Sequence, residues 1–133
     1  MGYTHYWQAA SFTDEQFHQL RVGVALMVSV EVSRGVNLDF STYDEKIFFN
    51  GIEEEAHESF VLDKEASGAS FCKTNAKPYD TIVVASLNLA KKINPNFEWS
   101  SDGEDDELLP GAELARCIIS DEEASTNTIK PIG

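Results

Sequence analysis

The sequence is short of basic residues. Lys and Arg together number 10, whereas Asp and Glu number 23, so the formal net charge is −13 at pH 7. A protein with this charge repels nucleic acid and anionic membranes at long range and attracts basic protein surfaces. The composition therefore disfavours direct binding to nucleic acid or to a membrane and favours a basic protein partner.

Cysteines, long apolar runs and cofactor motifs are also scarce. The two cysteines, Cys72 and Cys117, stand in neither a Cys-x-x-Cys pair nor a Cys/His spacing typical of zinc. No apolar run approaches the ~18 residues of a membrane span, and the opening residues "MGYTHYWQAASF" lack the pattern of a signal peptide. The glycine-rich phosphate-binding motifs of nucleotide-dependent enzymes are missing as well. We therefore expect a cytoplasmic protein with no cofactor.

The length and apolar content predict one domain over residues 1–133. A chain of 133 residues with 42% hydrophobic residues can bury a core without disulfides or a metal ion. Thr13 and Gln16 form a capping box that predicts a helix over 13–33, and Phe12 is placed to pack on Phe17. Pro78 suits the first position of a second helix, over 78–94. A short C-terminal helix is expected from about Gly111 to Asp121.

Short segments rich in β-branched and aromatic residues predict the strands. They are "YTHYWQA", "VNLDF", "KIFFNGI", "ESFVLD", "SFCKT" and "FEWSS", separated by turn residues such as Asn50-Gly51. We expect a single α+β domain, in which an antiparallel sheet of about four to five strands is covered by the two main helices. The short C-terminal helix would lie at the edge, and the tail from about residue 124 would be frayed.

Acidic residues concentrate in two blocks on either side of a basic middle. Residues 39–65 carry a net charge of −7 and residues 98–123 one of −9, whereas residues 66–97 carry +3. Such carboxylates can imitate the phosphates of nucleic acid and occupy the groove of a protein that binds it. The alternative is that they serve solubility alone. The residues expected to contact a partner are Asp44, Glu45, Glu53, Glu54, Glu55, Glu58, Asp102, Glu104, Asp105 and Asp106.

A second candidate site lies around the start of the helix expected over 78–94. Polar residues are close in sequence there, and backbone N–H groups at a helix N-terminus can hold an anion. With a histidine nearby, they would form a pocket for a phosphate or for acid/base chemistry. The structural alternative is that the lysines pair with surplus carboxylates while Asp80 caps the helix. The residues of this candidate pocket are His5, His57, Lys73, Lys77, Tyr79 and Asp80.

Neither metal binding nor nucleophilic catalysis has a matching motif. A zinc site such as His-Glu-x-x-His needs a second histidine at helical spacing, and "EEEAHESF" lacks it. The Gly-x-Ser-x-Gly elbow of serine hydrolases is missing too. The sequence therefore predicts no metal ligands and no catalytic residues.

Four short patches resemble a family of uncharacterised bacterial and phage proteins. They are "MGYTHYW" at the start, "HESF" at His57–Phe60, "FCKTNAKPYD" at Phe71–Asp80 and "SSDGE" at Ser100–Glu104. That family has no established function, so the resemblance implies a shared site without naming its activity. The residues that it implies for such a site are His5, Tyr6, Trp7, His57, Lys73, Tyr79, Asp80 and Asp102.

Three functional hypotheses follow from these patterns. The first is a small acidic interaction protein, encoded by a phage, that inhibits a host nucleic-acid-binding defence protein in the manner of an anti-CRISPR protein. The second is an enzyme or a phosphate or small-ligand binder built on the candidate pocket. The third is a homo-oligomer that buries Tyr3, Tyr6 and Trp7 between subunits. We favour the first, in which the protein is not an enzyme.

Overall fold

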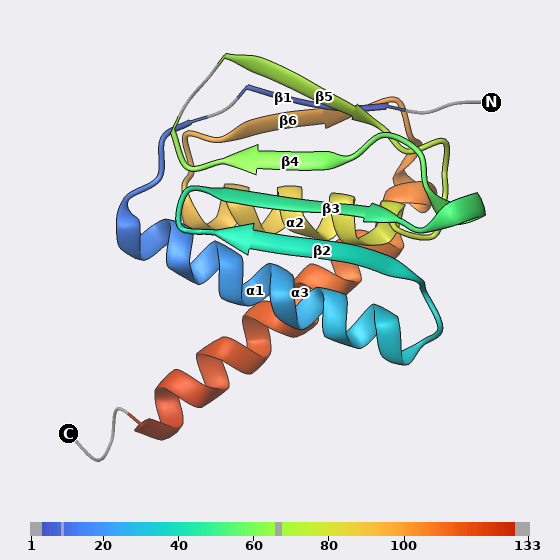
Figure 1. Cartoon of the computed structure of the whole chain (residues 1–133). Helices are drawn as coiled ribbons and strands as arrows, with labels where there is room; N and C mark the ends of the chain where they lie inside the picture. Colours follow the sequence, from blue (N-terminus) through green and yellow to red (C-terminus); the bar gives the residue numbers. More distant parts are fainter. Residues whose placement is uncertain (1–3, 9, 66–67, 130–133) are drawn as a thin grey trace.

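The computed structural model describes residues 4–8, 10–65 and 68–129 of the chain (Figure 1). The single-domain α+β class is confirmed. The elements, in chain order, are β1 (Thr4–Gln8), α1 (Asp14–Ser33), β2 (Leu38–Tyr43), β3 (Lys46–Gly51), the 3-10 turn η1 (Glu53–Glu55), β4 (Phe60–Asp63), β5 (Ala69–Lys73), α2 (Asp80–Ile93), β6 (Glu98–Ser101) and α3 (Asp105–Ile129).

The strands form two antiparallel sheets of three strands, in the orders β5-β1-β6 and β2-β3-β4, rather than the single sheet expected. Outside the two ladders, the backbone N–H of Glu58 donates to the carbonyl oxygen of Lys73 at 3.2 Å, which joins the start of β4 to the end of β5. The Phe60 ring of β4 packs against Trp7 of β1, with ring centroids 5.2 Å apart. The two sheets therefore share one hydrophobic core although their ladders are separate.

Local signals correctly predicted α1. The Thr13 side chain accepts from the backbone of Gln16, and the Gln16 side chain accepts from the backbone N–H of Thr13, so the capping box is present. The rings of Phe12 and Phe17 lie 5.9 Å apart, which confirms the expected contact across the helix start. After the helix, Gly35 has a φ of +97°, a conformation that glycine adopts without steric cost.

The helix α2 lies at the centre of the domain. It contacts both α1 and α3, and most of its side chains are buried. It begins at Asp80 rather than at Pro78, because Pro78 lies in a separate turn in which the backbone N–H of Asp80 donates to the carbonyl oxygen of Lys77 at 2.8 Å. Lys91 and Lys92 lie in its last turn, where the negative end of the helix dipole favours them.

The C-terminal helix α3 is much longer than the short helix expected. Its acidic first turn, Asp105–Glu107, precedes the expected start near Gly111, and the Glu107 side chain accepts from the backbone N–H of Glu104 at 2.7 Å. Acidic side chains are stabilising at this end because the helix dipole is positive there. Pro110 lies inside the helix, although it removes a backbone N–H donor. The segment from about residue 124, expected to be frayed, is helical as far as Ile129, and residues 130–133 lie outside the described residues.

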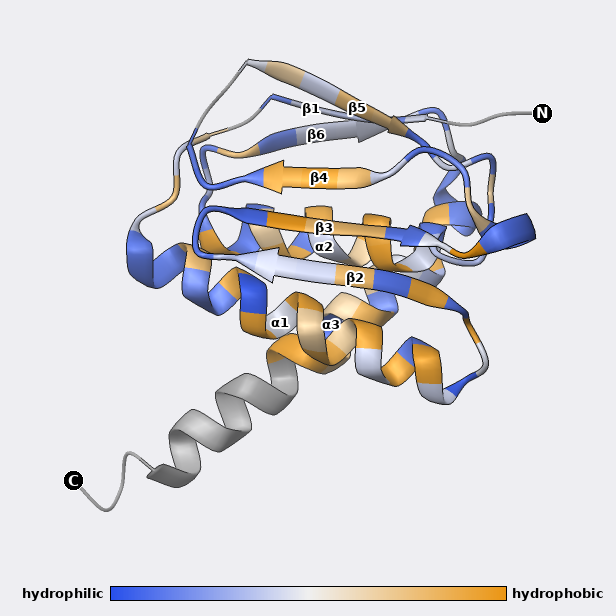
Figure 2. Cartoon of the chain, in the orientation of Figure 1, coloured by the Kyte–Doolittle hydropathy of each residue, from blue (hydrophilic) through white to orange (hydrophobic). Residues whose placement is uncertain are grey.

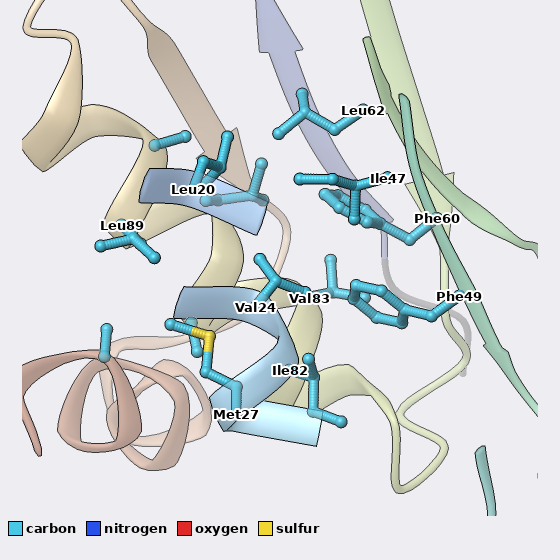
Figure 3. Close-up of a cluster of buried hydrophobic side chains, with 14 of the residues drawn as sticks. Leu20, Val24, Met27, Ile47, Phe49, Phe60, Leu62, Ile82, Val83 and Leu89 are labelled. Carbon is cyan, nitrogen blue, oxygen red and sulfur yellow. The ribbon is translucent and has the colours of Figure 1, made fainter. Parts of the chain in front are cut away.

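The core forms where the helices meet the inner faces of the strands. Figure 3 shows side chains of α1, such as Val24, and of α2, such as Val83, packed together against those of β3 and β4, such as Phe49. Hydrophobic residues run along β3 and β4, whereas η1 at the end of β3 is hydrophilic (Figure 2). Within the described ranges, every helix is too short or too polar for a transmembrane segment.

Candidate functional site

Eight of the ten predicted partner-binding carboxylates lie at one end of the molecule. The chain leaves β3, passes through η1 and enters β4 at this end, and the Glu58–Lys73 backbone bond ties it to the end of β5. Because β5 and β6 both pair antiparallel with β1, β6 also ends there, where it leads into α3 (Figure 1). We call this region the acidic end, which consists of Glu53, Glu54, Glu55, Glu58, Asp102, Glu104, Asp105 and Asp106.

The other two predicted contacts, Asp44 and Glu45, lie elsewhere. They form the turn between β2 and β3, at the opposite end of that sheet. Asp44 also makes an ion pair with Arg21 of α1, with 3.5 Å between the charged atoms. The sequence analysis grouped all ten residues as contacts of one partner, whereas the topology separates these two from the rest.

A backbone and side-chain clamp holds η1 in place. The Asn50 side-chain amide donates to the carbonyl oxygen of His57 at 3.0 Å, and its oxygen accepts from the backbone N–H groups of Gly51 and His57. Sequence reasoning interpreted Asn50-Gly51 as a hairpin turn, whereas both residues belong to the end of β3. The Asn50 side chain therefore positions η1, a role that the sequence analysis missed. The Asn50-Gly51 pair was the only feature of the sequence that drew attention to this position.

The carboxylates of the acidic end are not neutralised by neighbouring cations. Within the described ranges, none of the eight makes an ion pair. Three of them accept hydrogen bonds that fix their position: Glu55 from the backbone N–H of Asn37 at 3.3 Å, Glu58 from that of Lys73 at 2.7 Å, and Asp102 from the Tyr6 hydroxyl at 3.1 Å. Most are exposed, so their charge faces solvent.

The candidate pocket of polar residues is divided between the interior and the surface. Inside, His5 Nε2 lies 2.5 Å from Asp80 Oδ1, and the Thr74 hydroxyl donates to the same oxygen at 2.5 Å. The His5 side chain has no exposed surface, and Asp80 is buried as well. This arrangement stabilises the start of α2 and leaves no open face at which a substrate could meet both groups.

Tyr79 and Cys72 form a second buried group beside the first. The Tyr79 hydroxyl donates to the carbonyl oxygen of Glu58 at 2.5 Å, and the Cys72 thiol lies 3.4 Å from the same oxygen. Burial raises the pKa of the Cys72 thiol to about 12 and also raises the pKa of the Tyr79 hydroxyl. Both groups therefore remain protonated at neutral pH, and neither is activated as a nucleophile or a base.

The remaining pocket residues lie outside this interior. His57 Nδ1 is 3.0 Å from the carbonyl oxygen of Lys73, and both side chains are exposed. Within the described part of the chain, Lys73 and Lys77 make no ion pair, so the expected pairing with surplus carboxylates is not formed. Asp80 is the first residue of α2 and Tyr79 is its N-cap, and the Asp80 carboxylate bonds to His5 and Thr74.

Trp7 does not belong to an exposed aromatic patch of the kind that the oligomer hypothesis requires. It is buried against Phe60, whereas Tyr6 is exposed on the other face of β1, and Tyr3 lies outside the described residues.

Metal binding finds no support in the geometry either. No group of three or more His, Cys, Asp or Glu side chains converges on a possible metal position in the described ranges.

Six of the eight residues implied by the family resemblance meet in pairs. They are His5 with Asp80, Tyr6 with Asp102, and His57 with the backbone of Lys73, all near the acidic end. No protein-family model, curated protein or solved structure matches the chain. The resemblance therefore stays a prediction, and functional inference depends on the geometry.

Proposed function

We propose that the protein is a small acidic interaction protein whose acidic end binds the basic, nucleic-acid-binding surface of another protein. The main support is that two acidic segments, far apart in the sequence, lie together at one end of the fold. Carboxylates held on folded turns, with no ion-pair partner among the described residues, are available to a cationic surface. Complementary charge speeds the encounter and selects the partner.

The specific form of this proposal is an inhibitor, encoded by a phage, that blocks a host nucleic-acid-binding defence protein in the manner of an anti-CRISPR protein. A surface that binds nucleic acid is lined with Lys and Arg, which neutralise phosphates. The acidic end presents carboxylates to the same cations, so its binding and that of nucleic acid would exclude each other. The net charge of −13 adds long-range attraction to the contact.

The alternative of an enzyme is less well supported by the same geometry. His5 and Asp80 are buried partners of each other, and the Cys72 and Tyr79 groups are held protonated by burial. Catalytic groups have to reach a substrate, whereas these four side chains are buried in the interior. Their hydrogen bonds instead hold the start of α2 against the strands.

Charge reversal at the acidic end tests the proposal. Converting Glu53, Glu54 and Glu104 to lysine should weaken partner binding at least about tenfold, because three favourable charge contacts become repulsive. The measurement is affinity capture from bacterial lysate with mass-spectrometric identification, followed by titration of the identified partner. Wild-type binding should also fall steeply as salt rises from about 0.1 M to about 1 M, because the screening length shortens from roughly 10 Å to roughly 3 Å.

A matched variant separates position from total charge. Converting Asp44, Glu45 and Glu65 to lysine changes the net charge by the same amount, at exposed positions at the opposite end of the β2-β3-β4 sheet. This variant should retain most of the affinity. Equal loss in both variants would show that general charge, not the acidic end, determines binding, and capture of no nucleic-acid-binding protein by the wild type would reject the proposal.

A further inference from the structure

The outer face of the β5-β1-β6 sheet carries a shallow hollow of about 420 Å³. Cross-strand pairing places Phe71, Tyr6 and Ser100 in one row across the three strands, and Ala69, Gln8 and Glu98 in the next. Side chains directly opposite each other on neighbouring strands lie on the same face of a sheet. The small side chains of Ala69 and Ser100 beside larger ones leave the hollow open.

The rim of this hollow is aromatic and exposed. Phe71 is 62% exposed and Tyr6 is 43% exposed, and the two residues are directly paired across neighbouring strands. The floor is made by the backbone of Trp7, Ser70 and Trp99, whose side chains point away from this face because residues alternate along a strand. Two aromatic side chains on neighbouring strands are thus exposed to solvent at the hollow.

One carboxylate lines the hollow, and a second bonds to an aromatic residue of its rim. Glu98 lines it directly and makes an exposed ion pair with Lys91, with 3.0 Å between the charged atoms. Exposed pairs of this kind contribute little free energy and exchange readily with an incoming cation. Asp102 accepts the hydroxyl hydrogen bond of Tyr6, so the aromatic rim is continuous with the acidic end.

We propose that this hollow takes an arginine side chain from an extended basic segment of the partner. A guanidinium group stacks on aromatic faces and pairs with carboxylates, and Phe71, Tyr6 and Glu98 offer both contacts together. The charge complementarity of the hollow and of the neighbouring acidic end selects a cationic occupant. This inference rests on the proposed function and adds the side chain by which the partner is anchored.

The test uses a capped hexa-arginine peptide and its neutral citrulline counterpart. Isothermal titration should detect hexa-arginine binding to the wild type and no binding of the citrulline peptide. Backbone amide signals of Trp7, Ser70 and Trp99 should shift in NMR spectra, because these groups form the floor of the hollow. The double variant Tyr6→Leu/Phe71→Leu should bind roughly fivefold more weakly or worse, because it keeps apolar bulk and loses both ring faces.

Tyr43→Leu is the matched control, since Tyr43 is also 62% exposed but lies at the end of β2, outside the hollow. It should bind like the wild type. Equal affinity of the double variant, with amide shifts confined to residues 53–58 and 102–106, would overturn the arginine anchor and leave the proposed function standing. Failure of hexa-arginine to bind any variant would count against both. Dimerisation of the wild type that the double variant abolishes would show that a second copy occupies the hollow, which also overturns the anchor.

Discussion

Replacing Asp80 by alanine should lower the free energy of unfolding by about 3 kcal/mol. Its Oδ1 atom lies 2.5 Å from both His5 Nε2 and the Thr74 hydroxyl oxygen, all in the interior. Removing one member of a buried polar group leaves the others desolvated without that partner, which costs far more than loss of a surface contact. Urea denaturation followed by circular dichroism measures the change.

Two further variants show whether the effect comes from the buried contacts. Asp80→Asn keeps an oxygen at the same position and should lose much less stability. Asp14→Ala removes an aspartate that begins α1, but Asp14 is exposed and pairs with Lys64 at the surface. Its loss should be far smaller, because solvent screens such a pair. Similar losses for Asp80→Ala and Asp14→Ala would show that the His5–Asp80–Thr74 group does not support the fold.

Replacing Gly51 by alanine should destabilise the protein by about 1–3 kcal/mol and displace η1. A Cβ atom at this position would lie 2.0 Å from the carbonyl oxygen of Glu55 and 2.5 Å from its carbonyl carbon. These are backbone atoms, so no rotamer change can relieve the contact. The turn that carries Glu53, Glu54 and Glu55 would have to move, and the acidic end with it.

Gly23→Ala provides the comparison for Gly51→Ala. Its Cβ would meet the Cδ2 atom of Leu89 at 2.3 Å, which is the far end of a flexible side chain, and Gly23 lies within α1, where alanine has the higher helix propensity. It should therefore lose less stability than Gly51→Ala and bind the partner normally. If Gly51→Ala proves as stable as Gly23→Ala and binds as tightly as the wild type, η1 does not need its close packing on β3.

Local signals were sufficient for some elements and insufficient for others. Thr13, Gln16 and Gly35 specify the ends of α1 by hydrogen bonds and backbone conformation within a few residues, so the sequence predicted that helix well. The start of α3 was missed because its acidic first turn resembles a solvated loop. The division into two sheets depends on contacts such as Trp7 with Phe60, which join residues far apart in the chain.

The candidate sites also depend on contacts between residues far apart in the chain, which the sequence did not predict. The charge blocks were visible in the sequence, but only the strand order places Glu53–Glu55 and Asp102 at one end and Asp44 at the other. For the alternative pocket, sequence proximity suggested one open cluster. The fold instead encloses Asp80 with His5, which lies 75 residues earlier in the chain, because β1 lies in the centre of its sheet.

The most direct test of the proposed function is competition with nucleic acid for the captured partner. A labelled nucleic acid is bound to that partner, the acidic protein is added, and fluorescence anisotropy reports how much label is released. The account predicts that the wild type displaces the nucleic acid and that the Glu53→Lys/Glu54→Lys/Glu104→Lys variant fails to do so. Simultaneous binding of the wild type and the nucleic acid, or equal displacement by the variant, would contradict it.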